Sequence, residues 1–426
     1  MLTQEENERL TRVGPGTSVG ALMRRYWHPI AASAQLPSHG TKTIRVLGET
    51  LVLYRDRSGG LGLVGERCPH RRASMLYGVP EEDGLRCAYH GWLFNAAGRC
   101  TEQPYEQADN PQSTFKDRVC IKAYPVEELA GLIFAYLGPA PAPLLPRWDL
   151  FALGPEVARE VGAAVVPCNW LQITENSLDP VHVEWLHGHF KNYVFEKLGV
   201  DDRTSFGKHE KIGFSVFEYG IIKRRQLAGE DERDEDWATG HPLVFPYMLK
   251  SGSASHPTFQ IRVPIDDTHT MHWWYSCHLP RPGQPALPSD TIPYFDVPVP
   301  GVDAAGDPEW ALLDNNSGQD IAMWVTQGDV ADREEEHLGA SDRGVILYRQ
   351  LLKDNVERVE RGEDPMNVFR DPAQNVFLAL PVEEAKLGGR SGLRPGQRRA
   401  GGASKYSRLL GALDAQAPAA SAPSGT

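Results

Sequence analysis

The most informative stretch of this sequence contains two short motifs, Cys68-Pro69-His70 and, after sixteen intervening residues, Cys87-Ala88-Tyr89-His90-Gly91-Trp92. Each motif supplies one cysteine and one histidine from what we expect to be a tight loop. Two such loops facing each other would present two thiolates and two imidazoles to one centre. Sulfur and nitrogen ligands in this mixture are typical of zinc and iron–sulfur sites. The pattern therefore predicts a metal centre held by Cys68, His70, Cys87 and His90.

The order of the four residues separates the two kinds of metal centre. Structural zinc sites with two cysteines and two histidines mostly pair C-x2-4-C with H-x3-5-H. The interleaved order C-x-H and C-x2-H is the ligand set of a Rieske 2Fe–2S cluster, in which two histidines replace two cysteines on one iron. Neutral imidazole ligands raise the reduction potential of such a cluster. We expect a one-electron relay, with zinc as the alternative.

Cysteine usage indicates a reducing compartment. The candidate positions for a disulfide between the two loops hold Ala73 and Tyr89 instead of cysteines. Of the six cysteines, the four outside the loops show no paired spacing. A cytoplasmic protein is expected.

Length and composition set further bounds. A chain of 426 residues with 41% hydrophobic residues predicts two or three domains with substantial cores. The net charge of −12 argues against a nucleic-acid partner. The first residues lack the basic start and apolar core of a signal peptide, and no apolar run has the length of a membrane span, so no membrane association is expected.

The pattern along the chain predicts an α+β protein with an all-β N-terminal domain. Thr3 and Glu6 form a capping-box signal for a short helix. Strand-like segments occur at 43–47, 51–54 and 131–137, and the proline-rich segment 138–146 marks a boundary. We predict a helical segment over 1–25, the cluster domain over 26–140, a larger mixed domain over 141–411 and a disordered tail over 412–426.

The larger domain contains a clear amphipathic helix. Apolar residues recur at helical spacing from about Asp342 to Arg361, and Gly362 ends the pattern. Strand-like segments in the same domain include 217–222 and 259–264.

A second set of ligand-type residues lies in this domain. The run from Asn169 to His187 contains His182 and His187, which with one carboxylate would form the 2-His-1-carboxylate triad of a non-haem iron site. Five residues apart, the two side chains diverge by about 140° on a regular helix, so a π-type distortion or a helix end is required. Taken alone, the pair also fits ordinary polar or core roles.

Together, the two sets of motifs resemble the oxygenase (α) component of the Rieske non-haem iron oxygenases. The likeness is to the α-only group of phthalate dioxygenase-like enzymes and aromatic O-demethylases. It rests on the paired loops, the run N-W-x-Q-x-x-E-N-x-x-D-P-x-H-x4-H, and Gln319-Asp320 with 324–328. It implies a C-terminal helix-grip-like catalytic domain, an antiparallel sheet with helices, that holds a mononuclear Fe(II).

The resemblance also implies residue roles. His182, His187 and Asp320 match the iron ligands, although other carboxylates crowd the region of Asp320. Asp179 matches a bridging aspartate that accepts hydrogen bonds from His182 and from His90 of a neighbouring subunit, with a helix cap before Pro180 as the alternative. Asn176 resembles a residue that points toward the iron. This bridge implies a head-to-tail homotrimer without a β subunit.

The implied system is an oxidoreductase of aromatic catabolism, acting as a mono- or dioxygenase. A reductase using NADH or NADPH with a flavin and an iron–sulfur centre, directly or through a ferredoxin, would supply electrons for the use of O2.

The expected substrate is a small aromatic acid, phthalate-like or lignin-derived and methoxylated, which is hydroxylated or O-demethylated. Arg225 and Arg262 are candidates for its carboxylate, beside Lys223 and Arg224, and surface roles are the alternative. The run 272–275 could line a pocket or pack in the core. A non-aromatic substrate and a Rieske electron carrier without oxygenase chemistry are the competing functions.

Overall fold

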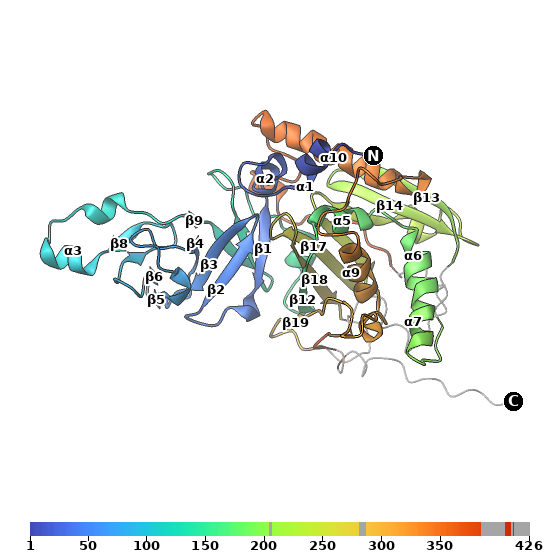
Figure 1. Ribbon diagram of the computed structural model, residues 1–426, viewed down its shortest axis with the longest axis horizontal. Coiled ribbons are helices and arrows are strands. Elements are labelled where there is room, and N and C mark those ends of the chain that lie inside the picture. The colour runs from blue at the N-terminus through green and yellow to red at the C-terminus, as the bar shows by residue number, and fades with distance from the viewer. Residues whose placement is uncertain (204–206, 281–286, 385–404, 410–411, 413–426) are drawn as a thin grey trace. The chain divides into compact units, whose positions relative to one another are not determined.

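The computed structural model describes residues 1–203, 207–280, 287–384, 405–409 and 412 (Figure 1). The chain divides into two compact units. One comprises Met1–Thr11, Arg147–Glu357 and Phe377–Thr426, and the other comprises Arg12–Pro146 and Arg358–Val376. Except for residue 412, the tail predicted to be disordered lies outside the described residues. None of the described helices has the length and apolar character needed to cross a membrane.

The smaller unit is built from three antiparallel sheets, as expected for an all-β cluster domain. The first has the strand order β1-β11-β10, the second β2-β3-β4-β9 and the third β5-β6-β7-β8. Their bounds are β1 Trp27–Ala32, β2 Thr41–Val46, β3 Glu49–Arg55, β4 Leu61–Gly65, β5 Val79–Glu81, β6 Gly84–Arg86, β7 Leu93–Phe94, β8 Cys100–Glu102, β9 Ala123–Tyr124, β10 Val126–Leu129 and β11 Leu132–Tyr136.

Short helical segments connect these strands. They are α2 Ser18–Met23, η1 Ser33–Gln35, η2 Met75–Tyr77, α3 Pro104–Asp109 and η3 Phe115–Arg118, with η7 Pro372–Gln374 from the C-terminal part of the chain. The strands predicted over 43–47, 51–54 and 131–137 are confirmed as β2, β3 and β11, and β11 is buried along its whole length.

The larger unit is organised by one eight-stranded sheet in the order β13-β14-β15-β16-β17-β18-β12-β19. All neighbours are antiparallel except β12 and β19. The strands are β12 Ala158–Val166, β13 His209–Phe217, β14 Gly220–Leu227, β15 His241–Val244, β16 Met248–Ser253, β17 His256–Pro264, β18 Thr270–His278 and β19 Tyr294–Asp296. An antiparallel sheet with helices agrees with the predicted helix-grip-like architecture.

The helices of this unit include those that carry the candidate site. They are α1 Gln4–Thr11, α4 Asp149–Ala152, α5 Trp170–Asn176, α6 His182–Glu184, the π-helical turn η4 Trp185–Phe190, α7 Lys191–Lys197, α8 Glu235–Ala238, η5 Trp310–Leu312, α9 Asn316–Thr326, η6 Ala340–Asp342 and α10 Arg343–Glu360. In Figure 1, α5 and α9 are drawn over the strands β17, β18 and β12.

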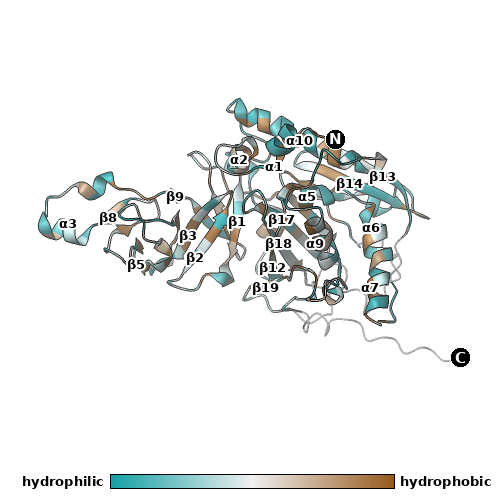
Figure 2. Cartoon of the chain, viewed as in Figure 1, coloured by the Kyte–Doolittle hydropathy of each residue, from teal (hydrophilic) through white to brown (hydrophobic). Residues whose placement is uncertain are grey.

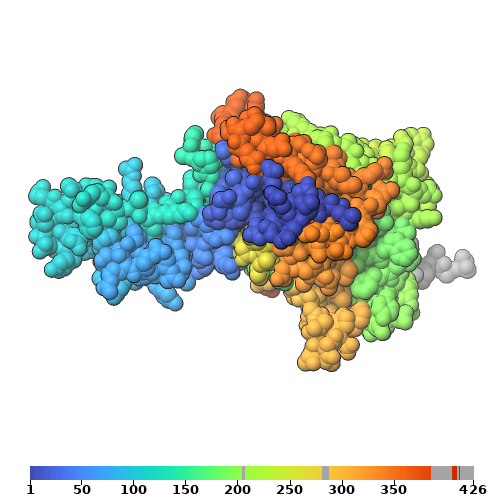
Figure 3. Space-filling view, turned by 45° about the horizontal axis from the view of Figure 1, so that its top comes forward, coloured from blue at the N-terminus to red at the C-terminus, as the bar shows by residue number. Residues whose placement is uncertain are grey.

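Two helices predicted from sequence are confirmed. The Thr3 hydroxyl accepts from the Glu6 backbone N–H at 3.2 Å, and the Glu6 carboxylate accepts from the Thr3 N–H at 3.0 Å, which is the expected capping box of α1. Helix α10 matches the amphipathic segment within one residue at each end, and it carries both teal and brown residues in Figure 2. Figure 3 shows the N-terminal residues in dark blue against orange α10, where Lys353 pairs with Glu6 at 3.0 Å.

The strand expected over 217–222 is wrong in its bounds. Phe217 ends β13 and Gly220 begins β14, so residues 218 and 219 form the turn of a hairpin. Gly220 has φ +153°, and a Cβ there would lie 2.1 Å from the Leu243 carbonyl oxygen, so the turn requires glycine. Lys223 and Arg225 therefore lie within β14. Since side chains alternate along a strand, both point to one face and Arg224 to the other.

Candidate metal centres

The first candidate centre is formed by two loops of the smaller unit. The Cys68 carbonyl accepts from the backbone N–H of Arg72, and the Cys68 N–H donates to the Ala73 carbonyl, which closes one loop. The Cys87 carbonyl accepts from the N–H of Gly91 at 2.9 Å in the same manner. Gly91 has φ +75°, a left-handed conformation that favours glycine, and this explains the glycine after His90 in the motif.

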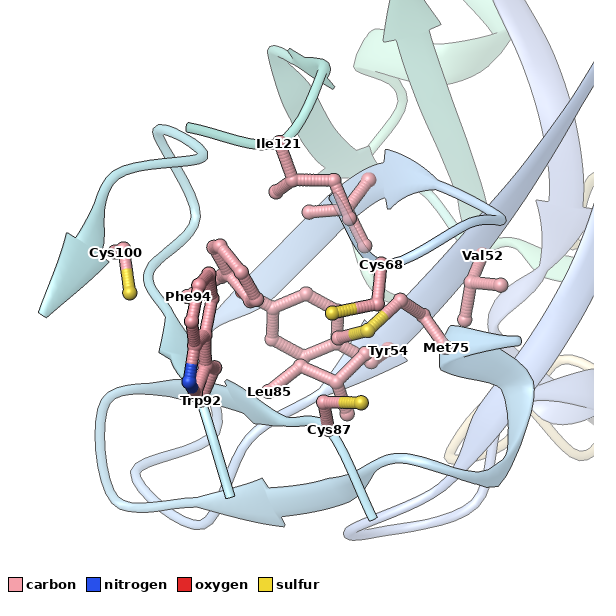
Figure 4. Packing of buried hydrophobic residues seen from close by; sticks show 11 residues of the cluster. Val52, Tyr54, Cys68, Met75, Leu85, Cys87, Trp92, Phe94, Cys100 and Ile121 are labelled. Carbon is pink, nitrogen blue, oxygen red and sulfur yellow. The ribbon is translucent and has the colours of Figure 1, made fainter. Parts of the chain in front are cut away.

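The two loops bring the four predicted ligands together. The Cys68 and Cys87 side chains are buried in one cluster, with Cys100 lying apart from them beyond Phe94 and Trp92 (Figure 4). Burial, together with the neighbouring Cys87 thiol, raises the pKa of Cys68 to about 11. A thiolate in this position therefore depends on a bound cation, as expected for a sulfur that ligates iron.

The two histidines lie closer to the surface than the cysteines. The rings of His70 and His90 have centroids 4.5 Å apart, and His70 stacks on Trp92 at 4.3 Å. Trp92 thus fixes one ligand ring by packing, which explains the tryptophan that closes the second motif. Two buried sulfurs and two half-exposed imidazoles fit a Rieske cluster whose histidine-bound iron faces outward.

The second candidate centre is formed in the larger unit by His182, His187 and Asp320. One ligand atom from each lies within 4.8 Å of the others. Asp320 Oδ1 is 3.2 Å from His187 Nε2 and 3.8 Å from His182 Nε2. Two imidazoles and one carboxylate on one side of a metal fit a non-haem Fe(II) site with open coordination positions.

The helix distortion that the spacing required is present. His182 begins α6, and His187 lies in the π-helical turn η4. A π turn takes one residue more than an α turn, so it rotates His187 back toward His182. The two rings meet edge to face with centroids 5.3 Å apart. Of the two predicted alternatives, a distortion or a helix end, the structure has the distortion, in the form of a π turn.

Gln319 orients the His187 ring through the ring nitrogen Nδ1, which lies away from Asp320. Its side-chain nitrogen donates to the Leu313 carbonyl at 2.8 Å, which fixes the side-chain oxygen toward His187. That oxygen lies 2.8 Å from His187 Nδ1, so Nδ1 carries the proton and donates. His187 Nε2 consequently presents its lone pair toward Asp320 and a metal. In the sequence, Gln319 stands out only as part of a motif.

Asp179 serves two groups at once. Its Oδ1 accepts from the backbone N–H of Val181 at 2.8 Å and of His182 at 3.3 Å, which is the helix-cap role considered from sequence. Its Oδ2 lies 3.4 Å from His182 Nδ1, longer than an ordinary hydrogen bond. Burial raises the pKa of Asp179, but His182, the Val181 N–H and Lys223 outweigh burial and leave it below the usual value. Asn176 is the last residue of α5 and is half-buried.

Basic residues of the sheet face this centre. Burial lowers the pKa of Lys223 to about 8, against the opposing effect of Asp179 and Asp320. Although burial opposes its ionisation, His187, His182 and Arg262 lower the pKa of Asp320 below its usual value. Arg262 is 1% exposed. Buried cations beside an iron site are suited to an anionic substrate.

Arg224 and Arg225 are neighbours on β14, so their side chains point to opposite faces of the sheet and have different surroundings. Arg224 is half-buried and donates to the Ser215 hydroxyl at 2.6 Å. Arg225 is buried and donates from Nη2 to Asp236 Oδ1 at 3.1 Å, but its Nε has no hydrogen-bond partner within the described part of the chain.

A second group of ligand-type residues, Asp236, His241 and Glu383, is fully buried. Arg225 pairs with Asp236, and His241 Nε2 lies 3.2 Å from Glu383 Oε1. Two carboxylates, one arginine and one histidine thus form a buried network of charged and polar groups.

Sequence reasoning missed the buried carboxylate Glu175. Arg333 donates to its Oε2 at 2.7 Å, and Arg349 donates to its Oε1 at 2.6 Å. Arg349 also pairs with Glu336. This network ties α5, which leads to Asp179, to α10. Glu175 is the glutamate of the run N-W-x-Q-x-x-E-N, but its partners lie more than 150 positions away in the sequence, so the run does not indicate them.

The two sites and the fold define the class of this protein: an oxygenase that couples a Rieske cluster to a mononuclear iron. A model of the Rieske [2Fe-2S] domain matches residues 26–125, and a model described as LigXa C-terminal domain like matches residues 307–376. The chain belongs to the Rieske non-haem iron oxygenases, as an oxygenase (α) component, and its cofactors are a 2Fe–2S cluster and mononuclear iron.

Two curated relatives narrow this assignment. The chain is 42% identical over 415 residues to the 5,5'-dehydrodivanillate O-demethylase oxygenase subunit of Sphingobium sp., covering 96% of this chain and 93% of the relative. It is 33% identical over 395 residues to the phthalate 4,5-dioxygenase oxygenase subunit of Pseudomonas putida, covering 85% and 88%. Among solved structures, Pseudomonas putida CBB5 NdmA shares the fold with a TM-score of 0.59 at 16% identity, covering 81% of this chain and 94% of that one.

Proposed function

We propose that this chain is the terminal oxygenase of a system that O-demethylates a lignin-derived methoxylated aromatic acid. The observation that carries the proposal is the 42% identity to a dehydrodivanillate O-demethylase subunit over nearly the whole chain. Ring hydroxylation of a phthalate-like acid is the second candidate, favoured by the similarity to phthalate 4,5-dioxygenase.

The proposed ligands follow from the two centres. Cys68, His70, Cys87 and His90 hold the 2Fe–2S cluster, which relays single electrons. His182, His187 and Asp320 hold the iron, which when bound supplies a coordination position for dioxygen beside the substrate. Gln319 holds His187 with Nε2 unprotonated, and Asp179 orients His182.

O-demethylation balances with one O2, two electrons and two protons. One oxygen atom enters the methyl C–H bond of the substrate to give a hemiacetal, and the other leaves as water. The hemiacetal then breaks its O–CH2 bond to yield a phenol and formaldehyde. The electrons come from NADH or NADPH through a reductase with a flavin and an iron–sulfur centre, directly or through a ferredoxin.

We propose Arg225 and Arg262 as the residues that hold anionic groups of the substrate. Both are buried, and each has an Nε that lacks a hydrogen-bond partner within the described residues. Arg225 keeps one N–H on Asp236 and Arg262 keeps two on Gln260, so both guanidinium groups are fixed before a substrate binds. Preorganised donors lose little entropy on binding.

The proposed assembly is a cytoplasmic homotrimer in which the cluster of one subunit serves the iron of the next. Asp179 is proposed to bridge His182 to His90 of a neighbouring subunit. Its carboxylate is 30% exposed at the side chain, which leaves room for a second donor. Sedimentation of an active species as a monomer would contradict this route.

Substrate-dependent oxygen uptake tests the proposed function. Purified protein with a reductase and NADH is offered methoxylated benzoates, a methoxylated biphenyl dicarboxylate and phthalate, and formaldehyde is assayed alongside. Formaldehyde equal to the oxygen consumed supports O-demethylation. A ring cis-diol without formaldehyde supports the second candidate, and oxygen uptake with none of these acids would contradict both.

A further inference from the structure

Four nitrogen atoms of buried side chains lack hydrogen-bond partners among the described residues, and they occur together beneath α9. They are both ring nitrogens of His272, Nε of Arg262 and Nε1 of Trp324. Their side chains are at most 1% exposed. Buried polar groups are nearly always paired, because an unpaired one costs about 1–3 kcal/mol, so this cluster calls for an explanation.

Strand register brings these groups to one place. Arg262 of β17 lies directly opposite His272 of β18, so their side chains leave the sheet on the same face as neighbours. His272 stacks between Trp274 at 4.1 Å and Trp324 at 5.1 Å. Trp324 is one turn after Asp320 on α9, so both side chains lie on one side of that helix. The cluster therefore adjoins the iron ligand.

The charge of this cluster selects its ligand. Burial and the neighbouring Arg262 lower the pKa of His272 well below its ordinary value, so its ring is neutral and offers one N–H. Arg262 adds a fixed positive charge, because its two Nη atoms donate to the carbonyl and the side-chain oxygen of Gln260, each at 3.0 Å. The Arg262 Nε–H and the His272 N–H, which are unpaired among the described residues, can therefore serve a negatively charged hydrogen-bond acceptor, and the charge of Arg262 disfavours a cation.

Resting on the proposed function, we infer that His272 is a substrate-binding residue that, with Arg262, holds a carboxylate of the aromatic substrate. One carboxylate oxygen accepts from Arg262 Nε and the other from the His272 N–H. Trp274 and Trp324 hold the imidazole ring in its plane by stacking. His272 discriminates acids from neutral analogues, and it takes no part in the redox chemistry.

Binding of a matched pair of probes tests this role. Calorimetric titration under anaerobic conditions compares 4-hydroxy-3-methoxybenzoate with its methyl ester, which has the same ring but no charge. The protein should bind the acid at least about tenfold more tightly than the ester, since a hydrogen bond to a charged group contributes that much.

The variant His272→Phe retains an aromatic ring between the two tryptophans and removes both nitrogens. It should weaken acid binding about tenfold and leave ester binding within about twofold. His269→Phe, at the half-exposed turn before β18, is the matched control and should change neither. Arg262→Gln combined with His272→Phe should lose less acid affinity than the sum of the two single changes, because both residues hold one group.

Folding of each variant is checked by the cluster absorbance and the unfolding temperature. Should His272→Phe fail to fold, His272→Gln retains a donor and should keep part of the preference for the acid. Equal losses for acid and ester, or no loss, would overturn the inference. Acid preference that depends on His272, without formaldehyde formation from any methoxylated acid, would support this subsite while refuting the proposed O-demethylation.

Discussion

The Asp179 carboxylate accepts a hydrogen bond from the His182 backbone N–H and also lies close to the His182 imidazole ring. Asp179 Oδ1 caps the helix turn by accepting the N–H of His182 at 3.3 Å, and Oδ2 lies 3.4 Å from Nδ1 of the same residue. One carboxylate thus caps the start of the helix and lies beside the ring of a predicted iron ligand. Structural capping and metal-site orientation are therefore compatible roles of Asp179.

Asp179→Asn separates these two roles, because asparagine caps helices as well as aspartate does but carries no charge. We expect an unchanged cluster spectrum and nearly unchanged stability. Substrate-dependent oxygen uptake should fall at least about tenfold, the usual effect of losing a partner of a metal-bound histidine. Rates of cluster reoxidation on mixing with O2 and substrate are the direct measurement. Turnover at the original rate would show that capping is the only role.

Gln319→Leu tests the orientation of His187. Leucine fills similar space but accepts no hydrogen bond from His187 Nδ1, so iron affinity should fall about 10–100-fold. Gln172→Leu is the matched control, since Gln172 is an equally buried glutamine that binds the backbone of Trp324 and Gly328 and no histidine. Iron per folded chain should fall only in the first variant. Equal iron loss in both would indicate a general packing effect.

The two metal centres could be predicted better than their surroundings. Each cluster motif places a cysteine and a histidine in one tight loop, Cys68 with His70 and Cys87 with His90. Residues so close in sequence stay close in space, however the rest of the chain folds. Helix geometry in the same way predicts a distortion or a helix end between the two predicted iron ligands, and the structure has a distortion there, the π turn.

Contacts between segments that lie far apart in the sequence could not be predicted. The register that sets Arg262 opposite His272 depends on strand pairing. For the same reason the sequence predicts one strand over 217–222, although residues 218 and 219 form a hairpin turn. The run that contains Glu175 does not indicate its partners Arg333 and Arg349, which lie far away in the sequence. Such pairs form only when the core packs, and the sequence around each residue does not indicate its partner.

Glu175→Gln should destabilise the larger unit by about 3–5 kcal/mol, because it leaves two buried arginines without their counter-charge. Burial raises the pKa of Glu175, but Arg333 and Arg349 outweigh it and hold the pKa below the usual value. The folded-state pKa is thus depressed, so this stabilisation is present above the unfolded-state pKa and is lost as pH falls through the folded-state pKa. Denaturant unfolding of both proteins should therefore converge in acid. A constant difference down to low pH would contradict this.

Iron analysis tests the two centres independently. The proposed ligand sets hold about three irons per chain, two in the cluster and one at the mononuclear site. Asp320→Ala should lower the count by about one and leave the cluster absorbance intact, whereas Cys87→Ser should remove the cluster. Loss of cluster absorbance in Asp320→Ala, or stoichiometric zinc in place of iron, would contradict the assignment of the sites.

Lys223→Met should stabilise the protein. Burial lowers the pKa of Lys223 to about 8, with Arg225 and Arg262 acting in the same direction and Asp179 and Asp320 opposing them. Because this folded-state pKa lies below that of the unfolded chain, keeping Lys223 charged lowers the free energy of unfolding. This lowering is fully present at pH 7 and diminishes as pH rises above about 8. Methionine removes it, so unfolding at pH 7 should require about 1–3 kcal/mol more.

Lys250→Met is the matched control for this stabilisation. Burial also lowers the pKa of Lys250, but its ammonium donates to Asp149 at 2.6 Å and to the Leu380 carbonyl at 2.8 Å. Its loss would leave the buried Asp149 carboxylate without a counter-charge, so Lys250→Met should destabilise the protein. Denaturant unfolding of both variants beside the unaltered protein is the measurement. If Lys223→Met unfolds more readily than the unaltered protein at pH 7, then Lys223 contributes to stability and is not held at a cost for binding an anion.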